Sequence, residues 1–240
     1  MSIKAVCFDC DGVLIDTISS WRIIHEHFGT NSGEMLDRFL RGEVSDEEFM
    51  ADDIGLWKSV QSDIHRDELM RCYQGVKLMT GAKELVEALQ ERGIIVAIVS
   101  AGVDLLIGSI AQLLKVDDWV SNGFQYDEDG FLLDDGIVRV PAHHKEDMVA
   151  KMARIHKLDP SEIVSVGDNH TDLSMRIPGS GFIGFNGQKC LGDPVAIFTD
   201  RGERLTHSVF RIQSSKGWVD IERSPGSFFP EGTLIFHCAL

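Results

Sequence analysis

Short, nearly uninterrupted apolar runs recur along this chain and constrain its fold more than any other feature. They occupy residues 3–8, 94–99, 163–166, 182–185 and 195–198. Strands that are apolar throughout, rather than alternating with polar residues, are typical of parallel sheets covered on both faces. These runs therefore predict buried parallel strands.

Segments with a helical repeat of apolar residues separate several of these runs. One follows Thr80, a predicted N-cap, and stops at Gly93, and another begins after Lys145. Residues 124–133 instead predict a β-hairpin around a polar turn. Strands that alternate with helices indicate an α/β fold with a doubly wound parallel sheet.

Residues 17–79 have a different character, because they contain no strand-like run and helical patterns dominate. A capping box at residues 45–48 begins one of these helices. The stretch is much longer than one crossover between parallel strands requires. We therefore expect a core of residues 1–16 and 80–240 and a small helical cap of residues 17–79, although a longer helical connection within the core stays open. Residues 201–240 form a tail of unassigned role, in which residues 233–236 could be a short strand.

Charge and composition narrow the classes of partner. The 38 acidic and 23 basic residues give a formal net charge of −15, which argues against nucleic-acid binding. The five cysteines are scattered, and no signal segment or membrane-spanning run is present. We expect a cytoplasmic protein with no membrane partner, either a monomer or a homodimer.

Asp9 and Asp11 directly follow the first apolar run and precede Gly12. Side chains two residues apart on an extended chain point to the same side, so the two carboxylates can converge. Such a pair needs a cation or a retained proton. Mg²⁺ prefers oxygen ligands, and a protonated carboxyl group can act as a general acid. The pair therefore predicts a catalytic or metal site, with a polar turn as the alternative.

Cys7 and Cys10 also form a CxxC sequence. Cys7 lies within the apolar run, which predicts a buried and inert thiol. The other cysteines stand alone, without the ligand spacing of a zinc site. Redox or zinc chemistry is therefore disfavoured.

Further polar residues follow other predicted elements. Ser100 and Ala101 come after the second run, where a hydroxyl and free backbone N–H groups can bind an anion. Lys145 begins a helix, and Asp168 and Asp172 follow the third run. Because ligands of open α/β sheets bind at the carboxyl ends of the strands, we expect all of these residues to meet Asp9 and Asp11.

In this order the motifs resemble those of the haloacid-dehalogenase-like (HAD) phosphohydrolase superfamily, which are DxD, a Ser or Thr, a Lys and GDxxxD. The resemblance covers roughly residues 3–187 and is greatest for phosphoserine phosphatases. It implies a Rossmann-like core with a helical type 1 cap. It also implies a phosphatase that uses Mg²⁺ and hydrolyses a small phosphorylated metabolite.

The resemblance also implies roles for individual residues. Asp9 would attack phosphorus and form an aspartyl-phosphate, and Asp11 would act as the general acid and base. Mg²⁺ would be held by Asp9, Asp168 and the backbone carbonyl of Asp11, and Asp172 would bind metal-bound water or anchor Lys145. The phosphoryl oxygens would be held by Ser100, Ala101 and Lys145.

Two positions depart from the phosphoserine phosphatase pattern. Ile18 stands where those enzymes carry the Glu that binds the substrate's amino group, and Asp53 stands where an ungapped match places the Arg that binds its carboxylate. We therefore expect that phosphoserine is not the preferred substrate. Other arginines could take over (Arg38, Arg41 or Arg66), and three histidines near the motifs are candidate substrate contacts: His143, His144 and His170.

Two other functions stay open. A phosphotransferase or phosphomutase would use the same aspartyl-phosphate, and a receiver-like signalling module would only store it. A receiver needs neither a large cap nor the second acid of the DxD motif.

Overall fold

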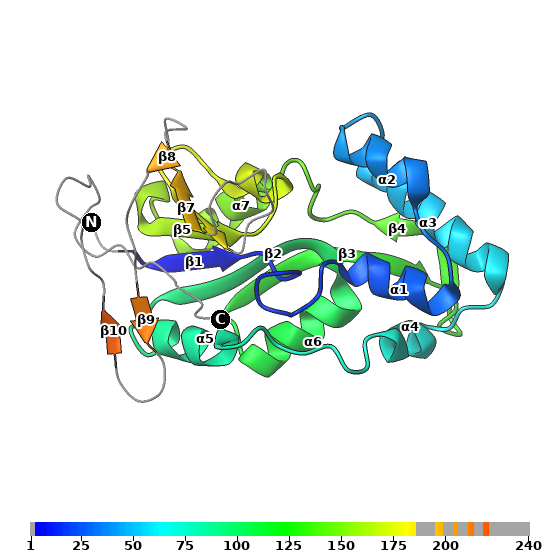
Figure 1. Cartoon of the computed structure of the whole chain (residues 1–240), viewed down its shortest axis with the longest axis horizontal. Coiled ribbons are helices and arrows are strands. Elements are labelled where there is room, and N and C mark those ends of the chain that lie inside the picture. Colours follow the sequence, from blue (N-terminus) through cyan, green and yellow to red (C-terminus); the bar gives the residue numbers. More distant parts are fainter. Residues whose placement is uncertain (1–2, 186–194, 199–203, 206–210, 214–217, 221–240) are drawn as a thin grey trace.

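The computed structural model describes residues 3–185, 195–198, 204–205, 211–213 and 218–220. Its main sheet contains the strands in the order β4-β3-β2-β1-β5-β6-β7-β8 (Figure 1). These strands are β1 (Ala5–Phe8), β2 (Ile95–Val103), β3 (Asp118–Tyr126), β4 (Leu132–Ile137), β5 (Ile163–Gly167), β6 (Gly181–Phe185), β7 (Val195–Phe198) and β8 (Arg204–Leu205). A separate antiparallel pair contains β9 (Arg211–Gln213) and β10 (Trp218–Asp220).

The five central strands β3, β2, β1, β5 and β6 are parallel, which confirms the predicted α/β fold. Phe8, the last residue of β1, lies opposite Ile98 on β2 and Val166 on β5, so β1 and β5 end at nearly the same level, whereas β2 continues to Val103. The residues that follow them therefore gather at one edge of the sheet.

Both faces of the central sheet are covered. Val6 and Phe8 belong to one buried cluster, which includes residues of α5 (Ala82–Gln90) and α6 (Asp104–Leu114). Ala5 and Cys7 belong to the other, together with residues of α7 (Glu146–His156). This arrangement explains why the strand sequence is apolar throughout rather than alternating.

Four helices lie between β1 and α5: α1 (Ser20–Phe28), α2 (Gly33–Leu40), α3 (Asp46–Val60) and α4 (Arg66–Cys72). We call residues 20–72 the helical insertion. It lies beside β3 and β4 (Figure 1), and the Trp57 ring meets the Phe124 ring edge-on at 5.7 Å. Ser45 and Glu48 form the predicted capping box at the start of α3.

Several details differ from the sequence predictions. α5 begins after Gly81, whose φ of +85° starts the helix from a left-handed residue, and not after Thr80. β7 pairs antiparallel to β6, so the prediction of a parallel strand there is wrong. The β3–β4 hairpin is confirmed. The first half of β3, which begins at Asp118, was not predicted, because the polar residues Ser121 and Asn122 interrupt the apolar run.

The predicted tail falls largely outside the described residues, and so does the predicted strand at residues 233–236. Within the described part of the chain, no helix has the length and apolar character needed to cross a membrane.

Candidate active site

Asp9 and Lys145 meet in the interior, at the carboxyl end of β1. Asp9 directly follows the strand, and its side chain is 4% exposed. Lys145 is the N-cap residue of α7, and its backbone N–H donates to Ser174 Oγ at 3.1 Å. The ammonium Nζ lies 3.0 Å from Asp9 Oδ1 and 2.6 Å from Asp172 Oδ1, so it ties the two carboxylates together.

The turn after β5 supplies two more carboxylates. Asp172 Oδ2 accepts the backbone N–H groups of Asp168 at 3.0 Å and Asn169 at 3.1 Å, which fixes the turn beside Asp9. One carboxylate oxygen from each of Asp9, Asp168 and Asp172 lies within 4.8 Å of the others. The structure thus brings together three of the predicted acidic residues from two strand ends.

The charges at this point do not balance. Four carboxylates lie near one another, those of Asp9, Asp11, Asp168 and Asp172, and the Lys145 ammonium opposes their charge through its contacts with Asp9 and Asp172. Burial, with the other carboxylates, raises the pKa of Asp9 to about 8 against the opposing effect of Lys145. Burial and the charge of Asp172 raise the pKa of Asp168 to about 7. A divalent cation would offset this excess, and the all-oxygen donor set suits Mg²⁺.

Asp11 is held by the first residue of the helical insertion. Its Oδ2 accepts the Ser20 backbone N–H at 2.6 Å and the Ser20 hydroxyl at 2.7 Å. The same hydroxyl oxygen accepts the Val103 N–H at 2.9 Å, so one serine joins α1, Asp11 and the end of β2. Asp11 Oδ1 is buried and has no hydrogen-bond partner among the described residues. The sequence analysis missed Ser20, although the Ser19-Ser20 pair before Trp21 was a visible helix-start signal.

Two glycines permit this close packing. Gly12 has φ +75°, and a Cβ there would lie 2.5 Å from Asp168 Oδ2. A Cβ at Gly102 would lie 2.7 Å from Ser20 Oγ and 3.0 Å from Asp11 Oδ2. A side chain at either position would push an acidic residue away.

A cavity of about 900 Å³ opens between the sheet edge and the helical insertion. Its lining includes most of the predicted site residues: Asp9, Asp11, Ile18, Ser100, Ala101 and Lys145. Ser100 is 1% exposed, and its Oγ accepts the Gly102 N–H at 3.2 Å. The predicted phosphate-binding residues therefore adjoin the carboxylates.

Asp53 does not lie on the cavity wall, contrary to the expectation from the ungapped match. It is fully buried inside the helical insertion, where its Oδ1 accepts the Ser32 hydroxyl at 2.9 Å and lies 3.0 Å from His25 Nε2. The position lies on the inner face of α3, with Ile54 and Trp57. The Asp53 carboxylate therefore stabilises the interior of the insertion and is not placed to contact a substrate.

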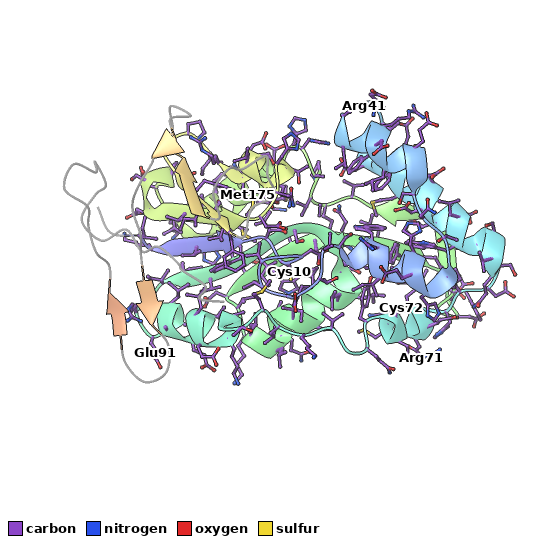
Figure 2. The ribbon with its side chains drawn as sticks, in the orientation of Figure 1. Cys10, Arg41, Arg71, Cys72, Glu91 and Met175 are labelled. Atoms are coloured by element: carbon purple, nitrogen blue, oxygen red, sulfur yellow. The ribbon has the colours of Figure 1, made fainter. Side chains whose placement is uncertain are left out.

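The arginines proposed as substitutes also lie outside the cavity wall. Arg41 projects at the far end of α2 (Figure 2) and binds Glu43 at 2.6 Å. Arg22 of α1, which the sequence analysis did not consider, does line the cavity, but it is paired with Glu26 at 2.8 Å.

The three candidate histidines have different surroundings. His170 lines the cavity, whereas His143 Nε2 lies 3.0 Å from the Phe39 carbonyl and joins the core to α2. His144 pairs with Glu146 at 3.2 Å and does not line the cavity.

Cys7 is a buried thiol, as predicted, and Cys10 is buried as well. Cys10 lies in the interior near β1, whereas Cys72 lies on α4 (Figure 2). Burial raises the pKa of Cys7 to about 12, which keeps that thiol protonated.

Comparison with known proteins agrees with this geometry. The haloacid dehalogenase-like hydrolase family matches residues 3–177. This chain therefore belongs to that family.

The chain is similar in sequence to several phosphoserine phosphatases. The chain is 30% identical to that of Archaeoglobus fulgidus over 195 residues, which is 79% of this chain and 54% of the relative. The chain thus spans about half the length of that protein. It is 28% identical to the enzyme of Lactococcus lactis, over 74% of this chain and 81% of the relative. A substrate-bound phosphoserine phosphatase structure has the same fold, with a TM-score of 0.68 at 22% identity over 81% of this chain and 91% of the other.

Proposed function

We propose that this protein is a Mg²⁺-dependent phosphomonoesterase that hydrolyses a small phosphorylated metabolite through an aspartyl-phosphate. The observation that carries this proposal is the cluster of neighbouring carboxylates of Asp9, Asp11, Asp168 and Asp172, two of which bind Lys145, beside a cavity that Asp9, Asp11 and Lys145 line. So many buried negative charges are unfavourable unless a cation binds there, and phosphate monoesters also need positive charge for transfer.

Asp9 and Asp168 would hold Mg²⁺ through their side chains, together with the backbone carbonyl of Asp11. When bound, the cation would neutralise charge on the phosphoryl oxygens and on the carboxylates. Asp172 has a different task, since both of its oxygens already bind Lys145 and the backbone of the β5 turn. We assign it to anchoring Lys145.

Asp9 would be the nucleophile. One of its oxygens forms a bond to phosphorus while the bond from phosphorus to the leaving alcohol breaks. Lys145 holds the Asp9 carboxylate in place at 3.0 Å and can also contact a phosphoryl oxygen. Ser100 and the backbone N–H of Ala101 would hold the remaining oxygens.

Asp11 is suited to act as the general acid and base. Burial raises the pKa of Asp11, and this favours a carboxyl group that carries a proton. The hydrogen bonds from Ser20 oppose the shift without reversing it. Ser20 occupies Oδ2, so Oδ1 is the oxygen left to give a proton to the leaving alcohol. The resulting carboxylate would then take a proton from the water that attacks the aspartyl-phosphate.

The cavity also favours an enzyme over the receiver-like alternative. A receiver would not need the helical insertion, a cavity of about 900 Å³ or Asp11. A phosphotransferase would share the intermediate, and it differs only in whether an added alcohol replaces water as the acceptor.

Phosphoserine is not the expected substrate. Ile18 on the cavity wall cannot pair with an ammonium group, and the Arg22 guanidinium is already paired with Glu26. A desolvated substrate charge without a partner is costly.

The proposal is tested with p-nitrophenyl phosphate. We expect Mg²⁺-dependent release of phosphate, loss of activity in EDTA, recovery when Mg²⁺ is restored, and no turnover by Asp9→Ala. A crystal structure with beryllofluoride should show beryllium bonded to Asp9. Activity that survives exhaustive chelation would exclude the metal role, and an active Asp9→Ala variant would exclude the nucleophile.

A further inference from the structure

The cavity lining also contains large apolar side chains that are exposed. Ile18, Leu36 and Leu40 line the cavity and are 72%, 40% and 47% exposed. Leu36 and Leu40 lie one turn apart on α2, so they form a continuous strip. Exposed apolar side chains gathered in a concave site are typical of a surface that binds an apolar ligand.

The polar side chains on the same wall are largely bonded to the protein itself. His25 Nδ1 lies 2.8 Å from Thr30 Oγ1 and also accepts the Trp57 indole N–H at 3.1 Å. Because an indole N–H can only donate, Nδ1 is an acceptor and the ring proton sits on Nε2, which faces Asp53 at 3.0 Å. The Ser32 hydroxyl donates to the same carboxylate. This group therefore offers few free hydrogen bonds to a ligand.

The charged side chains of the wall are satisfied in the same way. Arg22 pairs with Glu26, and Asp46 Oδ1 accepts the Ala142 N–H at 2.9 Å. Among the described residues away from the phosphate-binding end, Asn31 and His170 are the polar wall residues for which no such bond is seen. Within the described part of the lining, the charged side chains away from the phosphate-binding residues thus already have partners in the protein.

We propose that the substrate is a phosphate monoester of an uncharged alcohol with an apolar body, which packs against Ile18, Leu36 and Leu40. This inference rests on the proposed phosphatase activity and names the class of leaving group. The strip lines the same cavity as Asp9 and Lys145, so the leaving group of a phosphate held there can pack against it. A polyhydroxylated or zwitterionic leaving group would lose its hydration without gaining partners.

A series of n-alkyl phosphates, from methyl to hexyl, tests the inference. Alkanols differ little in acidity, so the chemistry of the leaving group stays nearly constant along the series. We expect kcat/KM to rise about fourfold for each buried methylene group, the equivalent of about 0.8 kcal/mol. Glycerol phosphate and O-phosphoserine should be poorer substrates than propyl phosphate. A flat series, or a preference for either polar ester, would overturn the inference and leave the proposed function standing.

Two variants of α2 test whether Leu36 and Leu40 cause the preference for longer alkyl chains. Leu36→Ser and Leu40→Ser should each reduce the ratio of kcat/KM for hexyl over ethyl phosphate by about fourfold or more. Leu113→Ser is the matched control, since Leu113 is 57% exposed on α6 and is not part of the wall, and it should leave the ratio unchanged. An unchanged ratio in both α2 variants would overturn the inference, because the strip would then not contact the leaving group. Failure to hydrolyse any ester would overturn the proposed function itself, and this inference with it.

Discussion

Asp11 depends on a residue from another element for its orientation. Ser20 gives it two hydrogen bonds and also accepts one from Val103, so the acid is held between α1 and the end of β2. The oxygen that would exchange protons, Oδ1, is left without a protein partner among the described residues. The orientation of Asp11 is therefore as much a part of the site as its acidity.

We predict that Asp11→Asn lowers kcat roughly 10²–10⁴-fold, the usual range for a lost general acid or base. Ser20→Ala should lower kcat less, because the backbone N–H of the residue still binds Asp11. It should also shift the alkaline limb of the pH–rate profile, along which Asp11 loses the proton that it gives to the leaving alcohol, to higher pH, since the lost hydrogen bond favours the ionised form.

Ser109→Ala provides the control for a lost hydroxyl, because Ser109 only bonds the Leu105 carbonyl within α6. A Ser20→Ala variant with the wild-type pH profile would contradict the positioning role. So would an equal effect in the Ser109→Ala variant.

The acidic residues of the site were predictable because each follows an apolar run, and parallel strands end at one edge of a sheet. Asp9, Asp11 and Asp168 were found in this way. Ser20 was not, because its partner lies across the chain and depends on how α1 begins. Asp53 was misplaced because an ungapped match does not fix which face of α3 points into the cavity.

A hydrogen-bonded cluster of four side chains joins three helices of the insertion. His25 is on α1, Ser32 precedes α2, and Asp53 and Trp57 are on α3. All four are bonded through the His25 ring or the Asp53 carboxylate. The group fixes α1 and α3, whose side chains form much of the cavity wall.

We predict that Asp53→Ala lowers the free energy of unfolding by about 1–3 kcal/mol, because it leaves buried His25 and Ser32 donors without their acceptor. Asp53→Asn retains an acceptor oxygen and should cost less. Urea denaturation followed by tryptophan fluorescence measures both. Equal stability of Asp53→Ala and the unchanged protein would show that the group is not held together as described.

The insertion also contacts the chain next to the site. Asp46 of α3 binds the Ala142 N–H, and the Phe39 carbonyl of α2 lies 3.0 Å from His143 Nε2, so two helices adjoin the loop that leads to Lys145. We propose that this insertion acts as the cap that excludes bulk water during the reaction. The core's strand ends alone would leave the site open.

We therefore predict that folded phosphoproteins are far poorer substrates than small esters. The test compares phosphate release from a folded phosphoprotein, from its unfolded peptide and from an alkyl phosphate at equal concentrations. The small ester should react fastest by a wide margin. Equal kcat/KM for the folded phosphoprotein would show that the helical insertion does not restrict access.

The order of the elements was easier to predict than their exact limits. Long helical and apolar patterns indicated the parallel sheet, the insertion and the hairpin. The first half of β3 and the start of α5 were missed, because Ser121 and Asn122 are buried by tertiary contacts and Gly81 begins α5 through a backbone conformation. Neither effect leaves a periodic signal in the sequence.

The charges of the site connect metal binding with the stability of the whole molecule. In the metal-free protein the pKa of Asp9 is raised to about 8 and that of Asp168 to about 7, from a model-peptide value of 3.8. The folded state then holds protons that the unfolded chain has already released. The free energy of unfolding must therefore fall as pH rises from the unfolded-state pKa of 3.8 to the folded-state values of about 7 and about 8.

We predict that the melting temperature of the metal-free protein decreases between about pH 5.5 and about pH 8. Carboxylates with lowered pKa values, such as Glu68 and Glu162, are already ionised in both the folded and the unfolded state over this range, so they do not change the stability there. Mg²⁺ binds the ionised carboxylates of the folded state only, so it should raise the melting temperature more at the upper end of this range than at the lower end. Thermal unfolding in EDTA and in excess MgCl₂, across the pH range, measures both effects. Asp168→Asn is the informative variant, since it should flatten the pH dependence in EDTA and weaken the stabilisation by Mg²⁺. A melting temperature that rises with pH in EDTA, or one that Mg²⁺ leaves unchanged at pH 8, would mean that the excess of buried negative charge is relieved in another way.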